Sequence, residues 1–161
     1  MRIIKLSPED MSFPDRRSVD MYFEQRLPNR IPEGQFFITK GRIARNGVEK
    51  GELLIFSYRN EIVYIAKAKS PRFTNQGVEK STYPHYFCVD CSTIEKGRGN
   101  LAELEQALRG INASSKNLVK AQGWPRLDDS QAVEMIWNQL KHSSKNQIWE
   151  SPYTGECPVY R

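Results

Sequence analysis

Two consecutive segments, residues 51–58 and 61–68, constrain the fold more than any other part of the sequence. Both are rich in β-branched and aromatic residues, and only the polar pair Arg59-Asn60 separates them. This pattern is typical of a β-hairpin with a tight turn. Alternate side chains of a strand point to opposite faces, and in both segments both faces are largely apolar. We therefore expect a central hairpin that is covered on both sides.

Weaker patterns on either side of this hairpin predict the remaining elements. Alternating or β-rich runs predict further strands over residues 2–6, 35–39 and 86–91. Apolar residues at helical spacing predict helices over residues 14–27, 100–109 and 128–141. The expected fold class is therefore α+β, with a small curved sheet or pseudobarrel and flanking helices. The length fits one domain over residues 1–161, of which 143–161 form a polar C-terminal tail.

Hydropathy argues against a membrane protein. Apolar runs such as Leu53-Leu54-Ile55-Phe56 are far short of the roughly 18 residues that a membrane span requires. The N-terminal apolar stretch is also too short for a secretory signal. We expect a cytoplasmic protein with no membrane partner.

The three cysteines do not suggest a disulfide framework, because Cys88, Cys91 and Cys157 form an odd set. Cys88 and Cys91 have the spacing of half a zinc site or of a redox pair, but no second pair of ligands follows at a suitable distance. Cys88 also belongs to an apolar strand, where cysteine commonly fills space. We favour packing over metal or redox chemistry, and we expect no metal and no cofactor.

The positive charge is concentrated in the first half of the chain. The net charge is +5, residues 1–80 hold 15 basic and 10 acidic residues, and residues 81–161 hold nine of each. Residues 40–72 alone contain eight basic and three acidic residues. Such a stretch attracts a phosphate backbone in a salt-dependent way, although an ordinary solubilising surface has the same composition.

Sequence motifs of enzymes are missing. The chain has no G-x-S-x-G elbow, P-loop, H-E-x-x-H helix or glycine-rich dinucleotide turn. The turn at 96–100 is basic and precedes a helix, a place where an anion can bind, but we favour a simple flexible turn. We expect a binding module, and a small enzyme acting on nucleotides or nucleic acid remains an alternative.

The hairpin carries a family resemblance. A Lys50-Gly51-Glu52 turn enters the first apolar strand, and residues 62–66 (Ile-Val-Tyr-Ile-Ala) begin the second. Over about 30 residues this segment resembles the core of PUA-like domains, particularly the EVE branch. The chain departs from the family pattern in three places. Glu52 stands where Asp is usual, Tyr64 stands where Gly is common, and Ser57 interrupts the usual Phe-Tyr pair.

The resemblance implies a pseudobarrel of five or six strands that binds DNA or RNA. Related EVE, YTH and SRA-type modules capture one base, often a modified one such as 5-methylcytosine or N6-methyladenine, in an aromatic pocket. The physics suits such a role, because a base–aromatic stack is worth roughly 1–3 kcal/mol and a buried methyl group adds about 0.8 kcal/mol. These terms offset the cost of removing a base from its stack.

Nine aromatic side chains are available for such a pocket, and most of them are expected in the core. They are Phe36, Phe37, Phe56, Tyr58, Tyr64, Phe73, Tyr83, Tyr86 and Trp124. The pocket is predicted from Phe36, which precedes the basic loop, from Tyr58 and Tyr64 beside the hairpin turn, and from Trp124 in a loop.

Polar side chains complete the predicted site. Asp90 is predicted to accept a hydrogen bond from an exocyclic amine of the base. The predicted phosphate contacts are Lys40, Arg42, Arg45, Lys67, Lys69 and Arg72. A different hypothesis is that the chain is an accessory protein of a phage, mobile element or defence system, whose basic loop meets an acidic protein partner.

Overall fold

The computed structural model describes residues 1–38, 48–77, 82–110, 118–120, 124–128 and 130–142. Within them the strands are β1 (Arg2–Leu6), β2 (Gln35–Ile38), β3 (Leu53–Tyr58), β4 (Glu61–Ala68), β5 (Phe73–Thr74) and β6 (His85–Lys96). The helical elements are α1 (Arg16–Met21), the π-helical η1 (Tyr22–Arg26), α2 (Leu27–Asn29), α3 (Leu101–Gly110) and α4 (Ser130–His142). The predicted tail over 143–161 lies outside the described residues.

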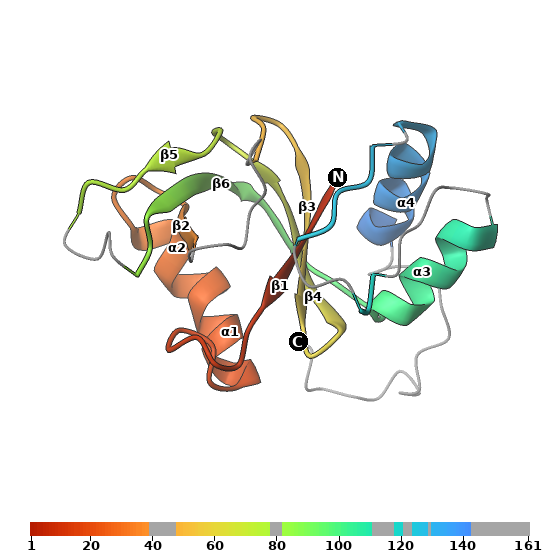
Figure 1. The fold of residues 1–161 in the computed structure, drawn as a ribbon, viewed down its shortest axis with the longest axis horizontal. Coiled ribbons are helices and arrows are strands. Elements are labelled where there is room, and N and C mark those ends of the chain that lie inside the picture. Colours follow the sequence, from red (N-terminus) through yellow and green to blue (C-terminus); the bar gives the residue numbers. More distant parts are fainter. Residues whose placement is uncertain (39–47, 78–81, 111–117, 121–123, 129, 143–161) are drawn as a thin grey trace.

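The strands form one mixed sheet in the order β1-β3-β4-β6-β2, with β5 also paired to β6. The β1–β3 pair is parallel and the other pairs are antiparallel. Figure 1 shows the sheet curling around α1 and α2, while α3 and α4 lie on its other side. The predicted α+β class with a small curved sheet and flanking helices is confirmed.

The central hairpin is confirmed together with its turn. β3 and β4 pair in antiparallel register from Leu53 opposite Lys67 to Tyr58 opposite Glu61. Both turn residues between them have positive φ, 49° at Arg59 and 66° at Asn60. Two left-handed residues are what a type I′ turn requires, and this turn matches the right-handed twist of the strands.

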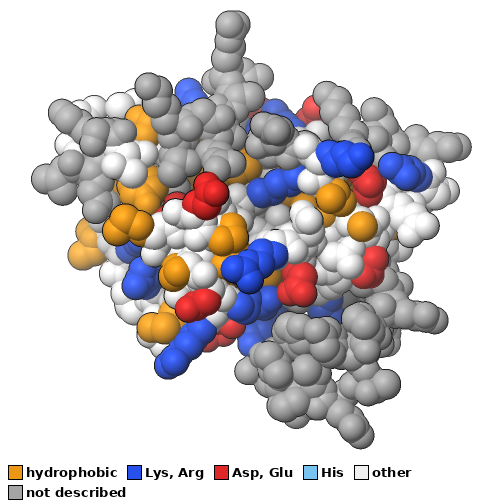
Figure 2. Space-filling model, turned by 60° about the horizontal axis from the view of Figure 1, so that its bottom comes forward, with side chains coloured by type: hydrophobic (Ala, Val, Ile, Leu, Met, Phe, Trp, Pro, Cys, Tyr) orange, Lys and Arg blue, Asp and Glu red, His pale blue; other side chains and the backbone are white. Residues whose placement is uncertain are grey.

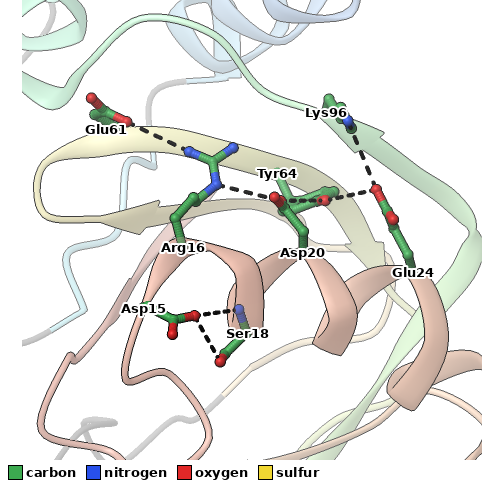
Figure 3. Close-up of polar contacts among 8 residues, drawn as sticks. All are labelled: Asp15, Arg16, Ser18, Asp20, Glu24, Glu61, Tyr64 and Lys96. Carbon is green, nitrogen blue, oxygen red and sulfur yellow. Dashed lines mark hydrogen bonds and ion pairs between the residues drawn. The ribbon is translucent and has the colours of Figure 1, made fainter. Parts of the chain in front are cut away.

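The inner, concave face of the sheet packs on the helical segment formed by α1, η1 and α2. Asp15 caps this segment, because its Oδ1 accepts the backbone N–H of Ser18 at 2.8 Å and the Ser18 hydroxyl at 2.9 Å (Figure 3). Val19, Phe23 and Leu27 recur every four residues and are at most 1% exposed. This apolar stripe holds the segment against the sheet.

Among the described elements, α3 and α4 cover the outer, convex face of the sheet over its central strands. Ile3, Ile55 and Ile65 of the central strands pack in a second cluster with apolar side chains of α3 and α4, such as Leu104 and Ile136. The hairpin is therefore buried on both faces, as its two apolar faces predicted. No helix of the described ranges is both long enough and apolar enough to cross a membrane.

Two local features shape the sheet where β2 and β5 flank β6. Gly34 has φ +78°, and a Cβ built there would lie 2.0 Å from the carbonyl oxygen of Val89, so β2 can approach β6 only with glycine at this position. On the other edge of β6, Ser70-Pro71 separates β4 from β5. The Ser70 hydroxyl accepts the Cys88 N–H at 2.9 Å, and this bond takes the place of a backbone hydrogen bond between neighbouring strands.

Candidate nucleic-acid interface

Four partly exposed aromatic rings lie on the outer face of β2, β6 and β5 and in the turn before β6. Phe37, Tyr86 and Phe73 stand directly opposite one another on the three strands. Their ring centroids are 6.4 Å apart between Phe37 and Tyr86 and 5.6 Å apart between Tyr86 and Phe73. Tyr83 adds a fourth ring, 5.4 Å from Phe37. Phe73 is 43% exposed and the other three are half-buried. We call these four residues the outer aromatic row.

The alternation of side chains explains why these rings face outward. In β2, Phe36 and Ile38 point inward and are 2% and 1% exposed, so Phe37 between them points outward. In β6, Phe87 is fully buried and Tyr86 before it lies on the other face. The same strands thus supply rings to the core and to the surface.

Arg30 places a fixed positive charge beside the row. Its Nη1 donates to the carbonyl oxygen of Gln35 at 2.7 Å and to the hydroxyl of Tyr22 at 2.9 Å. Its guanidinium carbon lies 5.1 Å from the centroid of the Phe37 ring and 4.8 Å from that of Tyr22. Both distances are within the range of a cation–π interaction, so the arginine side chain is held in one orientation.

Exposed lysines continue the same face beyond the row. Lys67 stands opposite Asp90 on β6, while the neighbouring pair, Ala68 and Val89, is buried in the core. Lys67 therefore points outward. Lys69 is also exposed, and its backbone N–H donates to the Cys88 carbonyl at 2.7 Å. At about 3.3 Å per residue, Asp90 lies roughly 13 Å along β6 from Tyr86, so the lysines and the rings share one surface.

Asp90 organises an irregularity in β6. Its Oδ1 accepts the backbone N–H of Ser92 at 3.1 Å and the Ser92 hydroxyl at 2.6 Å. The hydroxyl of Thr93 donates to the Asp90 carbonyl at 2.6 Å and accepts the Lys67 N–H at 2.8 Å. These bonds satisfy the backbone where the register between β4 and β6 shifts. A contact between Asp90 and a base stays a prediction.

The four rings predicted for the base pocket belong to the core. Phe36, Tyr58 and Tyr64 are 2%, 4% and 2% exposed, and Trp124 is 9% exposed. Phe36 and Trp124 are brought together, with centroids 6.1 Å apart, and the Tyr58 hydroxyl donates to the Phe13 carbonyl at 2.8 Å. Other side chains cover these rings, so a base cannot stack on them in this conformation. The expected pocket is corrected accordingly: these rings hold the inner face of the sheet on its helical segment.

Tyr64 belongs to a polar cluster that links the first helical segment to the sheet (Figure 3). Its ring stacks on Phe23 with centroids 4.4 Å apart, and its hydroxyl donates to Asp20 Oδ1 at 2.8 Å. Burial, together with the neighbouring carboxylates, raises the pKa of Tyr64 far above its usual value, so the phenol stays protonated. The ion pairs around it are Arg16–Asp20 at 3.3 Å, Arg16–Glu61 at 3.5 Å and Lys96–Glu24 at 3.8 Å. Each carboxylate has a basic partner, so the cluster serves as a structural tie.

The cysteine pair shows no sign of activation. Cys88 and Cys91 are both free thiols. Burial raises the pKa of Cys88, and burial together with Glu33 and Asp90 raises the pKa of Cys91 to about 11. A reactive cysteine needs the opposite shift, because the thiolate is the nucleophile and the metal ligand. Within the described parts of the chain, no group of three or more His, Cys, Asp or Glu side chains is arranged to hold a metal ion.

Three of the six residues predicted to contact phosphates are among the described residues. Lys67 and Lys69 are exposed on the outer face, and Arg72 is half-buried directly before Phe73. The other three, Lys40, Arg42 and Arg45, lie outside the described residues.

None of the family models, curated proteins and solved structures compared with the chain matches it. The function is therefore inferred from its own residues.

Proposed function

We propose that the protein binds DNA or RNA through the outer face of β2, β5 and β6. The observation that carries the proposal is that partly exposed aromatic rings and exposed lysines occupy one sheet surface, on which none of the described helices packs. Aromatic side chains give bases a face to stack on, and basic side chains bind the phosphates that connect those bases. The site differs from the predicted pocket in its rings but keeps Lys67 and Lys69.

Electrostatics supports the same proposal. The chain carries a net charge of +5, and its basic excess lies wholly in residues 1–80, which include β2, β4 and β5. A positive surface raises the local concentration of a polyanion and speeds its association. Each phosphate contact releases counterions, so the affinity should fall linearly with salt concentration on logarithmic axes.

A PUA-like assignment is part of this proposal. A small curved sheet with helices on both faces is compatible with the pseudobarrel that the resemblance at residues 46–68 implies. A PUA-like reader binds methylated and plain bases with different affinities, because a buried methyl group is worth about 0.8 kcal/mol, or roughly fourfold.

The experiment is a binding panel of single- and double-stranded DNA and RNA, with and without methylated bases, at two salt concentrations. The double variant Lys67→Ala and Lys69→Ala removes two charges from the proposed surface. We expect it to weaken binding to all sequences alike and to lower the salt slope by about 0.7–0.9 for each contact. Arg98→Ala, beyond the opposite end of β6, removes one positive charge away from the proposed surface; it is the control and should leave the slope unchanged.

Two results would contradict the proposal. One is that no nucleic acid of the panel binds at low salt. The other is that the double variant and the Arg98→Ala control lose the same affinity and the same salt slope, because the surface around β6 would then have no special role.

A protein partner is the second candidate, and two exposed apolar side chains favour it. Met11 is 94% exposed and Ile31 is 95% exposed, so a partner that covered them would bury apolar surface. An acidic protein that co-purifies in stoichiometric amount, with affinity undiminished at high salt, would support this candidate over nucleic acid.

A further inference from the structure

We propose that the outer aromatic row takes single-stranded nucleic acid, with unpaired bases stacked on Phe37, Tyr86 and Phe73. This inference rests on the proposed function and names its substrate class. It replaces capture of one extruded base in a closed pocket by an open platform on a sheet.

The spacing of the rings is the first argument. Neighbouring rings of the row are 5.6 and 6.4 Å apart, because they stand on adjacent strands. Bases of a duplex follow one another every 3.4 Å along each strand and stack on one another. Successive bases on this row must therefore be separated from each other, which a single strand permits without any loss of pairing.

The openness of the row is the second argument. Phe73 is 43% exposed at the edge of the sheet, and the helices that cover the outer face pack on the central strands instead. The row crosses three strands, and its neighbouring rings are inclined to each other by 65° (Phe37 and Tyr86) and 50° (Tyr86 and Phe73), so each ring offers a separate face to a separate base. A single flipped base needs an enclosed pocket instead. Sheets that bind single-stranded RNA use aromatic side chains in this way.

The charges around the row favour nucleic acid as its occupant. Arg30 is held over the ring of Phe37, and Lys67 and Lys69 follow along the same face. Figure 2 shows Lys and Arg side chains interspersed with Asp and Glu side chains on the face of the molecule that is turned forward there. An interface between proteins typically lacks charge at its centre, whereas stacked bases with phosphates at their margin need apolar and basic groups side by side.

Substitutions of Phe73 test the stacking directly, because this residue is the most exposed of the row and lies in a two-residue strand. Phe73→Leu keeps an apolar side chain but removes the aromatic face, and Phe73→Trp enlarges that face. We expect Phe73→Leu to weaken binding of a single-stranded oligonucleotide about 5- to 150-fold, and Phe73→Trp to retain or tighten it. Met135→Ala, at a 37% exposed side chain of α4, is the control and should bind like the wild type.

Duplexes of the same sequence provide the second arm. We expect the wild type to prefer the single strand, and Phe73→Leu to lose most of that preference while its circular dichroism and melting temperature stay unchanged. Salt-dependent binding that is equal for both forms and insensitive to Phe73→Leu would overturn this inference and leave the proposed function standing. Absence of any salt-dependent binding by the wild type would overturn the proposed function itself.

Discussion

The neighbouring residues Phe36 and Phe37 allow a sharp test of which face of the sheet is buried. Phe36 packs against Tyr22, Phe56 and Phe87 with ring centroids 5.8, 5.5 and 5.3 Å apart, and it is 2% exposed. Phe37 points the other way and is half-buried. Replacing each by alanine removes the same atoms from two different environments.

The expected loss of stability is larger for Phe36→Ala than for Phe37→Ala. A buried Phe→Ala change costs about 3–5 kcal/mol, which lowers the melting temperature of a chain of this size by roughly 6–20 °C. Phe37→Ala gives up its ring contacts and the cation–π interaction with Arg30. These, together with the half-buried ring area, are worth about 2–3 kcal/mol, or roughly 4–12 °C. Binding should show the reverse order, because only Phe37→Ala removes a stacking face.

Thermal and urea denaturation followed by circular dichroism measure the first effect, and binding of a labelled single-stranded oligonucleotide measures the second. The binding assay is run at a temperature where both variants are folded. If Phe37→Ala proves the more destabilised of the two, or if Phe36→Ala alone reduces affinity, the assignment of faces in β2 is refuted.

Three further predictions concern stability. Gly34→Ala should lower the free energy of unfolding by more than the strain of an alanine in the left-handed region, which is about 1–2 kcal/mol, because the new Cβ would meet the carbonyl of Val89. A variant as stable in urea as the wild type would contradict this. Tyr64→Phe should lose about 1 kcal/mol by removing the donor to Asp20, and an unchanged midpoint would show that this bond contributes nothing. The backbone and side-chain hydrogen bonds that Asp15 accepts at the helix N-terminus lower its pKa from 3.8. The stability that the Asp15 carboxylate contributes to the folded state is therefore complete above about pH 4 and is lost as the pH falls through the lowered pKa. The difference in melting temperature between wild type and Asp15→Ala should shrink toward about pH 2, and a constant difference would argue against it.

The sequence was most informative where one strand pattern repeats without interruption. The hairpin at 51–68 is rich in β-branched and aromatic residues and has a two-residue turn, so the hairpin, its turn and its burial on both faces were predictable. The shift of register between Phe56 and Ser57 was not predicted. The helices were predictable because their apolar residues recur at helical spacing.

The choice of site rings was less predictable, because it depends on which face of each strand the helices cover. Side-chain alternation in β2 predicts that Phe36 and Ile38 lie on one face and Phe37 on the other. The sequence therefore contained the information that separates Phe36 from Phe37. Tyr58 and Tyr64 could not be placed in this way, since both faces of their hairpin are apolar. Phe73 lies in a strand of two residues, and only its pairing with β6 brings it beside Tyr86. Such long-range register has no local pattern.

The most direct test of the nucleic-acid surface is a nuclear magnetic resonance titration of the labelled protein with a single-stranded oligonucleotide of about eight nucleotides. Stacked bases should shift the aromatic ring signals of Phe37, Phe73 and Tyr86 together, with smaller changes at Lys67 and Lys69. Signals of α3 and α4 should stay in place. Shifts confined to α3 and α4, or ring signals that do not move at saturating oligonucleotide, would contradict the account.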